Sequence, residues 1–184
     1  MKKDDIRKII IDARNNLSKK EIHDKSIMIA SKLNSLKEYQ NAKIVLCYAS
    51  FKSEVETLGI INDALSSDKI VAIPKVENEG QISFHVIKSI NDLSPGFNGI
   101  PEPKYNLLDS SLIKDSLIIV PGTVFNKDGY RMGYVKGYYD RFIDKYKPKI
   151  KIGIAYDLQI SNDIIINNHD QKMDMVITEI NIYK

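Results

Sequence analysis

Residues 116–142, SLIIVPGTVFNKDGYRMGYVKGYYDRF, join an apolar run to a segment rich in glycine and tyrosine. The run at 116–122 predicts a buried strand that ends at a proline and a glycine. A helix is expected to begin near Gly137 and to continue to about Tyr146. In an open parallel sheet, ligands bind beyond the carboxyl ends of the strands. The segment that follows this strand is therefore the first place to look for a binding site.

Short apolar runs alternate with helical patterns along the rest of the chain. The tetrapeptide SKKE, which begins at Ser18, has the capping-box pattern that starts a helix. Strands that alternate with helices predict an α/β fold. We expect one domain over residues 1–184, a three-layer sandwich with a mainly parallel central sheet and helices on both faces. Helices are expected from about Lys3 to Leu17, from Ser18 to near Lys37 and over 55–67, strands at 43–49, 69–76, 81–87, 151–156 and 174–180, and a surface loop at 94–105.

Length and composition indicate one globular core. Of the 184 residues, 43% are hydrophobic and 28% are charged, and the formal net charge is +3. The one cysteine, Cys47, lies in the apolar run KIVLCYA and is expected to be buried. The N-terminus is charged and lacks the apolar core of a signal peptide, and no window is long enough to span a membrane, so we expect a cytoplasmic protein with no membrane partner. Because the two signs of charge are interspersed, we expect no nucleic-acid partner, and a monomer is the default expectation.

The Gly/Tyr segment, residues 129–142, has the composition of an anion-binding loop. Glycine lets a backbone approach phosphates closely and exposes N–H donors. Arg131, Lys136 and Arg141 can neutralise phosphate charge, and Asp140 can hold a divalent cation that bridges phosphates. The spacing fits neither a Walker A loop nor a dinucleotide fingerprint. Composition alone leaves a second interpretation open, in which a glycine-rich turn packs its tyrosines over the edge of the core.

The stretch VPGTVFNKDGYRMGYVKGYYDRF, residues 120–142, resembles the signature of the 5-formyltetrahydrofolate cyclo-ligases, also called 5,10-methenyltetrahydrofolate synthetases. Further motifs similar to those of the family occur in the family's order. These are the K-x-x-[LI]-R pattern at Lys3–Arg7, EYQNAKIVLCYASFKSEVET at 38–57, AIPKV at 72–76, GIPEP at 99–103 and HDQKMDMVITE at 169–179. The resemblance covers essentially the whole chain.

The resemblance implies an enzyme that uses ATP and Mg²⁺ to convert 5-formyltetrahydrofolate to 5,10-methenyltetrahydrofolate, with release of ADP and phosphate. An N-formyl amide is a poor electrophile, and its oxygen is a poor leaving group. Transfer of the γ-phosphoryl group to that oxygen lets the N10 amine attack the formyl carbon while phosphate departs. Phosphoryl transfer depends on positioning and charge. In agreement, the sequence shows no Ser/His/Asp or Cys/His constellation.

The resemblance also implies roles for residues that would otherwise be read as a solvated helix face, turn charges or core packing. Lys136 is expected to stabilise charge on the transferred phosphoryl group, with Arg131 and Tyr138 as further catalytic residues. Glu54 is expected to accept hydrogen bonds from the pterin ring. The full assignments are Lys3, Arg7, Arg131, Gly133, Tyr134, Lys136, Gly137 and Tyr139 for ATP, Ala49, Glu54, Tyr134, Val135, Lys136, Gly137 and Tyr138 for the folate, and Asp140 and Asp170 for Mg²⁺.

Val135 departs from the family signature, which has a glycine at this position. If the position requires a positive φ angle, valine is strained there. If it requires close backbone approach, valine crowds a ligand. We expect an ordinary β or α conformation with a shifted loop path. Two alternatives stay open: a folate- or nucleotide-binding protein with weak or lost turnover, and a phosphoryl transferase that acts on another small acid.

Overall fold

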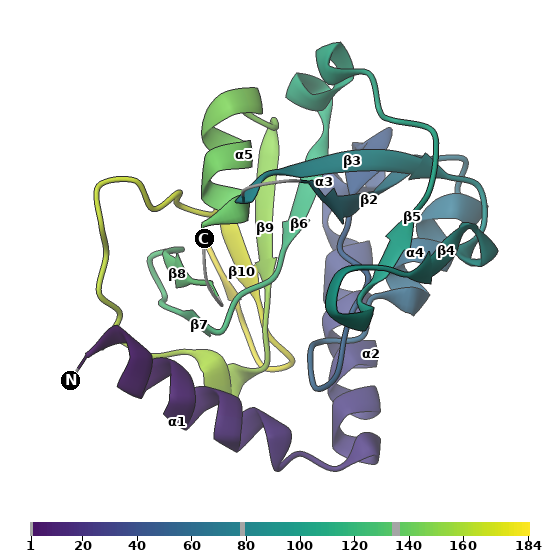
Figure 1. Cartoon of the computed structure of the whole chain (residues 1–184). Helices are drawn as coiled ribbons and strands as arrows, with labels where there is room; N and C mark the ends of the chain where they lie inside the picture. The colour runs from purple at the N-terminus through teal and green to yellow at the C-terminus, as the bar shows by residue number, and fades with distance from the viewer. Residues whose placement is uncertain (1, 78–79, 134–136) are drawn as a thin grey trace.

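A computed structural model describes residues 2–77, 80–133 and 137–184 (Figure 1). Its centre is a sheet with the strand order β11-β10-β9-β6-β1-β2-β3. The inner strands are parallel to one another, and the edge strands β3 and β11 are antiparallel to their neighbours. This confirms the α/β fold with a mainly parallel sheet. The strands span Ile44–Leu46 (β1), Ile70–Val76 (β2), Ile82–Ile87 (β3), Leu117–Val120 (β6), Ile150–Ile154 (β9), Met175–Ile177 (β10) and Ile182–Tyr183 (β11).

Both faces of the sheet are buried beneath helices. Successive side chains of a strand point to opposite faces. In β6, Ile119 packs into the core on one face, and Ile118 packs into the core on the other. The first face is covered by α2 (Lys19–Ser35) and α4 (Leu58–Ser66), and the second by α5 (Tyr138–Tyr146). The three-layer arrangement is therefore confirmed.

The order of the parallel strands reverses at β1. From β1 the chain passes through α4 to β2 on one side, and it later returns to β6 on the other side of β1. In doubly wound sheets, ligands bind at such a reversal, beyond the carboxyl ends of the two strands concerned. The segments that follow Leu46 and Val120 border this position.

Helix α1 (Lys3–Asn15) lies along the carboxyl end of the sheet, below the hairpin of β7 (Val124–Phe125) and β8 (Arg131–Met132) in Figure 1. Ile6 of α1 is buried and packs against Val124 and Met132 of this hairpin. The apolar face of the first helix thus holds the segment that leads into the Gly/Tyr loop.

Two glycines make room for the ring of Phe125, which is fully buried. A Cβ atom at Gly122 would lie 2.7 Å from this ring, and one at Gly153 would lie 2.5 Å from it. Both distances are shorter than packed carbon atoms allow, so any side chain at either position would displace the ring. The close approach of the hairpin to β6 and β9 therefore depends on glycine.

The segment 94–105, predicted as a surface loop, is largely exposed but contains two short strands. These are β4 (Leu93–Pro95) and β5 (Pro101–Pro103), which pair antiparallel and are joined by the 3₁₀ turn Phe97–Gly99. Asn98 and Gly99 turn the chain with φ angles of 55° and 79°, a conformation that these residue types tolerate. Three-residue strands bounded by proline are too short to produce a periodic pattern, which explains why they were not predicted.

Element ends also differ from the predictions. Helix α2 begins where the capping box places it, with the Glu21 N–H donating to the Ser18 hydroxyl. Helix α4 begins at Leu58 instead of residue 55, because Thr57 is engaged with Ser50: the Ser50 N–H donates to the Thr57 hydroxyl and the Thr57 N–H to the Ser50 hydroxyl. The helix α3 (Lys37–Asn41) and the strands β7, β8 and β11 were not predicted. Cys47 is fully buried, as expected.

Candidate functional site

Arg131 brings a buried positive charge to the end of β6. Its side chain is almost completely buried, and its Nη1 donates to Oδ2 of Asp140 over 3.2 Å. Nη2 lies 3.2 Å from Oδ1 of the same carboxylate. Nε and Nη2 nevertheless make no hydrogen bond within the described part of the chain. A buried guanidinium with unsatisfied donors is costly unless an anion completes it, so this group can receive an anionic oxygen.

Asp140 joins the start of α5 to the segment before β10. Besides Arg131, its carboxylate accepts a hydrogen bond of 3.0 Å from the Gln171 N–H. The neighbouring Asp170 accepts from the Asn167 N–H over 2.6 Å, and it lies 3.7 Å from the ammonium group of Lys3. Two carboxylates and two cations from distant parts of the sequence therefore meet beside the Gly/Tyr loop.

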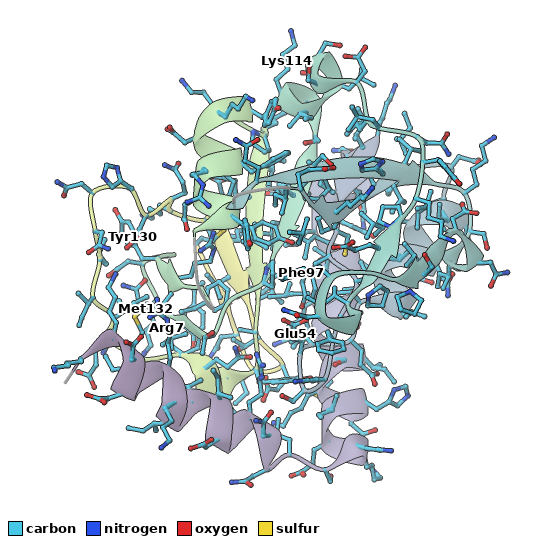
Figure 2. All side chains as sticks on the ribbon, viewed as in Figure 1. Arg7, Glu54, Phe97, Lys114, Tyr130 and Met132 are labelled. Carbon is cyan, nitrogen blue, oxygen red and sulfur yellow. The ribbon has the colours of Figure 1, made fainter. Side chains whose placement is uncertain are left out.

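Arg7 forms a hydrogen bond with the backbone of Gly133 in the Gly/Tyr segment. Its Nε donates to the Gly133 carbonyl over 2.9 Å, and its Nη1 donates to Asp4 over 2.8 Å. Figure 2 shows Arg7 beside Met132, on the side of the molecule where α1 meets the hairpin. Both cations that the resemblance assigned to α1, Lys3 and Arg7, thus face the same loop region.

Glu54 lies beyond the end of β1, on the other side of the strand reversal. Its Oε2 accepts a hydrogen bond of 2.9 Å from the Phe51 N–H. Burial raises the pKa of Glu54 above its ordinary value, while the Phe51 N–H and the charge of Arg14 lower it. A carboxylate in this environment gains from a ligand that donates hydrogen bonds to it.

Tyr139 connects the two halves of the site. Its ring lies 6.0 Å from the Arg131 guanidinium carbon. Burial raises the pKa of Tyr139 far above the usual range; the charge of Glu54 raises it further, whereas Arg131 lowers it. The charges of both Arg131 and Glu54 therefore affect this phenol, which stays protonated.

Tyr138, which is expected to contact the substrate, lies beside Arg141 and Gly80. The guanidinium of Arg141 lies 5.8 Å from its ring centroid, and a Cβ atom at Gly80 would lie 3.5 Å from its Cε1. Arg141 also donates to the Gly80 carbonyl. Of the adjacent tyrosines, Tyr139 is the one whose ring lies near Arg131.

The remaining assigned residues divide into two groups. Tyr134, Val135 and Lys136 lie outside the described residues. Ala49 is buried directly after β1. Gly137 is the N-cap of α5 with a φ angle of 58°, a left-handed conformation that glycine adopts without strain.

Two tyrosines near Glu54 were missed. The Tyr48 hydroxyl donates to the Val55 carbonyl over 3.1 Å, and the Tyr156 hydroxyl donates to the Glu54 carbonyl over 2.9 Å. Each follows the end of a parallel strand, β1 or β9. The predicted strands at 43–49 and 151–156 include Tyr48 and Tyr156, whereas β1 and β9 end two residues before these tyrosines. A search beyond the predicted strand ends therefore passes over both.

The donor set is compatible with a metal-bound nucleotide. Mg²⁺ on phosphates commonly takes one or two protein carboxylates and keeps waters, and Asp140 and Asp170 supply that number. No group of three or more His, Cys, Asp or Glu side chains that could enclose a metal ion occurs within 2–77, 80–133 and 137–184. The unsatisfied donors of Arg131 are suited to a phosphate or carbonyl oxygen. In the same ranges, no helix is both long and apolar enough to cross a membrane.

The model of the 5-formyltetrahydrofolate cyclo-ligase family matches residues 1–179. The mouse (Mus musculus) 5-formyltetrahydrofolate cyclo-ligase is 31% identical over 89% of this chain and 86% of its own length. A probable 5-formyltetrahydrofolate cyclo-ligase of Schizosaccharomyces pombe is 32% identical over 97% of this chain and 95% of its own.

Solved structures agree with the sequence relatives. The 5,10-methenyltetrahydrofolate synthetase of Aquifex aeolicus superposes with a TM-score of 0.87 at 33% identity, covering 100% of this chain and 93% of that one. The synthetase of Mycoplasma pneumoniae gives a TM-score of 0.78 at 27% identity, covering 97% and 99%. The matched length, the fold and the placement of the motif at the strand reversal agree, and the chain belongs to the 5-formyltetrahydrofolate cyclo-ligase family.

Proposed function

We propose that this protein converts 5-formyltetrahydrofolate to 5,10-methenyltetrahydrofolate at the expense of ATP, with release of ADP and phosphate. The observation that carries the proposal is Arg131, a buried cation at the carboxyl end of β6 whose Nε and Nη2 find no hydrogen-bond acceptor among the described residues. It lies in the motif that resembles the family signature, and Glu54 lies across the strand reversal from it. The relatives named above are cyclo-ligases and synthetases, which supports the same reaction here.

The reaction closes a ring through an activated formyl group. The formyl oxygen takes the γ-phosphoryl group, which turns that oxygen into a leaving group. The N10 amine then attacks the formyl carbon, the carbon–oxygen bond breaks, and the oxygen departs within phosphate. The N10 proton is lost, and the formyl carbon, already bonded to N5, is now bonded to N10 as well. Mg²⁺ supplies charge neutralisation on the phosphates when it is bound.

The residues contribute position and charge. Arg131 binds the oxygen that is being phosphorylated or the phosphoryl group itself, and Lys136 stabilises the charge of the same group. Lys3 and Arg7 bind ATP phosphates from α1, and Asp140 and Asp170 would hold Mg²⁺. Glu54 orients the pterin ring by accepting its N–H donors. The further contacts proposed are Gly133, Tyr134, Gly137 and Tyr139 for ATP, and Ala49, Tyr134, Val135, Lys136, Gly137 and Tyr138 for the folate.

The test follows formation of the methenyl product by its absorbance, with ATP and 5-formyltetrahydrofolate as substrates. Lys136→Ala and Asp140→Ala are expected to lower kcat at least about 100-fold, the usual loss when a group that stabilises developing charge is removed. Lys145→Ala and Asp144→Ala, at exposed positions of α5, are the matched controls and should keep the parent rate. Equal losses in the α5 controls would contradict the proposed roles.

Val135 supports one alternative, a binding protein with weak or lost turnover. The parent would then bind ATP and folate by calorimetry and form no methenyl product, and Val135→Gly would restore turnover. Product formed by the parent at a rate that Val135→Gly does not increase excludes this alternative. Phosphorylation of a different small acid, with no reaction of the folate, would instead indicate a phosphoryl transferase.

We further propose a cytoplasmic, monomeric, single-domain enzyme. Sedimentation equilibrium at several concentrations and cell fractionation test the first two properties. A single cooperative unfolding transition, observed by two independent probes, tests the third.

A further inference from the structure

Arg14 is a buried cation in the last turn of α1. Only 3% of its surface is exposed, and burial lowers its pKa. Its Nε donates to the Ser53 hydroxyl over 3.1 Å, and that hydroxyl donates to Oδ1 of Asn15 over 2.5 Å. Burial of a guanidinium lowers the stability of a protein unless neighbouring groups accept its hydrogen bonds or balance its charge.

The neighbours of Arg14 lie in one loop. Residues 47–57 connect the end of β1 to the start of α4, and Ser53 and Glu54 lie within this loop. The loop is fixed by Tyr48, through the Val55 carbonyl, and by Tyr156, through the Glu54 carbonyl. Arg14 adds a third attachment, through the Ser53 side chain, and this attachment is charged.

The charge of Arg14 acts on Glu54. Burial raises the pKa of this carboxylic acid, and the positive charge of Arg14 lowers it. Without the cation, the effect of burial would raise the pKa of Glu54 further. The neutral acid would then persist to a higher pH. The other titratable groups that act on or contact Glu54 are Tyr48 at the end of β1, Tyr139 on α5 and Tyr156 beyond β9.

We propose that Arg14 is a positioning residue for the reduced folate: it fixes the loop that carries Glu54 and supplies the positive charge that keeps Glu54 an acceptor. The inference rests on the proposed function, since it takes Glu54 to be the group that binds the pterin ring. Arg14 contacts neither ATP nor the formyl group in this scheme. It acts through Ser53 and Glu54.

The experiment measures binding of 5-formyltetrahydrofolate without ATP, by calorimetry, between pH 5 and pH 8. Arg14→Gln is expected to weaken folate binding about tenfold at pH 7, equivalent to about 1.4 kcal/mol, and to leave ATP binding within about twofold of the parent. Folate binding is expected to weaken on the acidic side of this range as Glu54 becomes protonated, and we call this part of the pH profile the acid limb. The acid limb should move to higher pH in Arg14→Gln. In Arg14→Lys, which keeps the charge, the limb should stay near the parent position.

Ser53→Ala separates position from charge. It removes the acceptor of the Arg14 Nε and keeps the cation, so folate binding should weaken while the acid limb stays in place. Lys8→Gln, an exposed position on the same helix, is the control and should match the parent in every respect. An unchanged acid limb in a folded Arg14→Gln variant would overturn the proposal.

A ligand-free measurement keeps this outcome distinct from failure of the proposed function. The carboxyl carbon of Glu54 can be titrated by NMR in the parent and in Arg14→Gln, with folding confirmed by thermal unfolding at each pH. A higher midpoint in Arg14→Gln supports the charge coupling even if the parent binds no folate, in which case the proposed function alone fails. Identical midpoints overturn the role of Arg14 whether or not the parent is active.

Discussion

The Nε atom of Arg7 donates a hydrogen bond of 2.9 Å to the carbonyl oxygen of Gly133, 126 positions away in the chain. The bond ties the first turns of α1 to the backbone that leads into residues 134–136. A side chain of α1 therefore helps to hold the backbone at Gly133. The sequence around Arg7 does not predict this contact. Since Ile6 anchors the same helix to Val124 and Met132, α1 holds the hairpin through both an apolar and a polar contact.

We predict that Arg7→Gln raises the KM for ATP about tenfold and leaves the KM for 5-formyltetrahydrofolate within about twofold. The reason is location, because Arg7 lies with Lys3 on the side where ATP is proposed to bind, and its hydrogen bonds go to Gly133 and Asp4. Initial rates measured with each substrate varied in turn give the two constants. Lys8→Gln is the control. An equal rise of both KM values would show that the loss is general and not confined to the nucleotide.

The ion pair of Arg131 and Asp140 leads to a prediction about stability. Asp140→Asn leaves a buried guanidinium without its counter-charge, so we expect the free energy of unfolding to fall by roughly 3 kcal/mol. Urea denaturation of the ligand-free protein measures it. Asp144→Asn, on the exposed face of the same helix, should change the free energy of unfolding by less than about 0.5 kcal/mol.

A double-mutant cycle tests whether the pair itself is responsible. Arg131→Met removes the cation, and Asp140→Asn in that background should cost much less than in the parent, because no unpaired charge remains. Additive losses would indicate that Asp140 stabilises the protein through the Gln171 N–H and not through Arg131.

Long periodic segments were predictable from the sequence and short ones were not. Helix α2 and strand β6 have strong patterns of their own, and the Ser18 cap marked its helix correctly. The hairpin of β7 and β8 and the pair of β4 and β5 consist of two- and three-residue strands. Their position is set by contacts such as Phe125 against Gly153, which lie far apart in the sequence and leave no local pattern.

The site was predictable to the extent that it follows a strand end. The end of β6 pointed to Arg131 and Asp140 from local sequence alone. Glu54, Lys3 and Arg7 became candidates only through the family resemblance, since a lone charge in a turn or on a helix has no distinguishing pattern. Arg14 and Tyr156 gained no role at all, because their partners, Ser53 and the Glu54 carbonyl, are reached only after folding.

Gly153→Ala is expected to destabilise the protein by about 1–3 kcal/mol, the usual range for overpacking a well-filled core. The new methyl group would lie 2.5 Å from the ring of Phe125. Thermal or urea unfolding measures the loss, and Phe125→Leu in the Gly153→Ala background should recover part of it because the smaller side chain makes room.

Gly59→Ala is the matched control for that substitution. Gly59 lies within α4 and a Cβ atom there meets no atom within 4 Å, so alanine should stabilise the helix by about 0.5–1 kcal/mol. Destabilisation of similar size at both glycines would show that loss of glycine, and not contact with Phe125, is responsible.

The last prediction concerns alkaline pH. Burial raises the pKa of Tyr156 to about 12, from an ordinary value of 10.0. Between these values the unfolded chain loses the phenol proton while the folded protein keeps it, so this tyrosine makes the folded state progressively less stable as pH rises from 10 to 12. A shift of two units corresponds to a loss of roughly 3 kcal/mol.

Tyr156→Phe removes both this titration and the hydrogen bond to the Glu54 carbonyl. Near pH 8 the variant should be less stable than the parent by about 1 kcal/mol, the value of one hydrogen bond. As pH rises toward 12 the deficit should vanish and then reverse, because phenylalanine has no proton to lose. Urea denaturation at each pH gives the two curves. Tyr105→Phe, at a ring that is 75% exposed, should follow the parent curve, and a Tyr156→Phe curve that stays parallel to the parent up to pH 12 would show that the phenol is not buried as the structure places it.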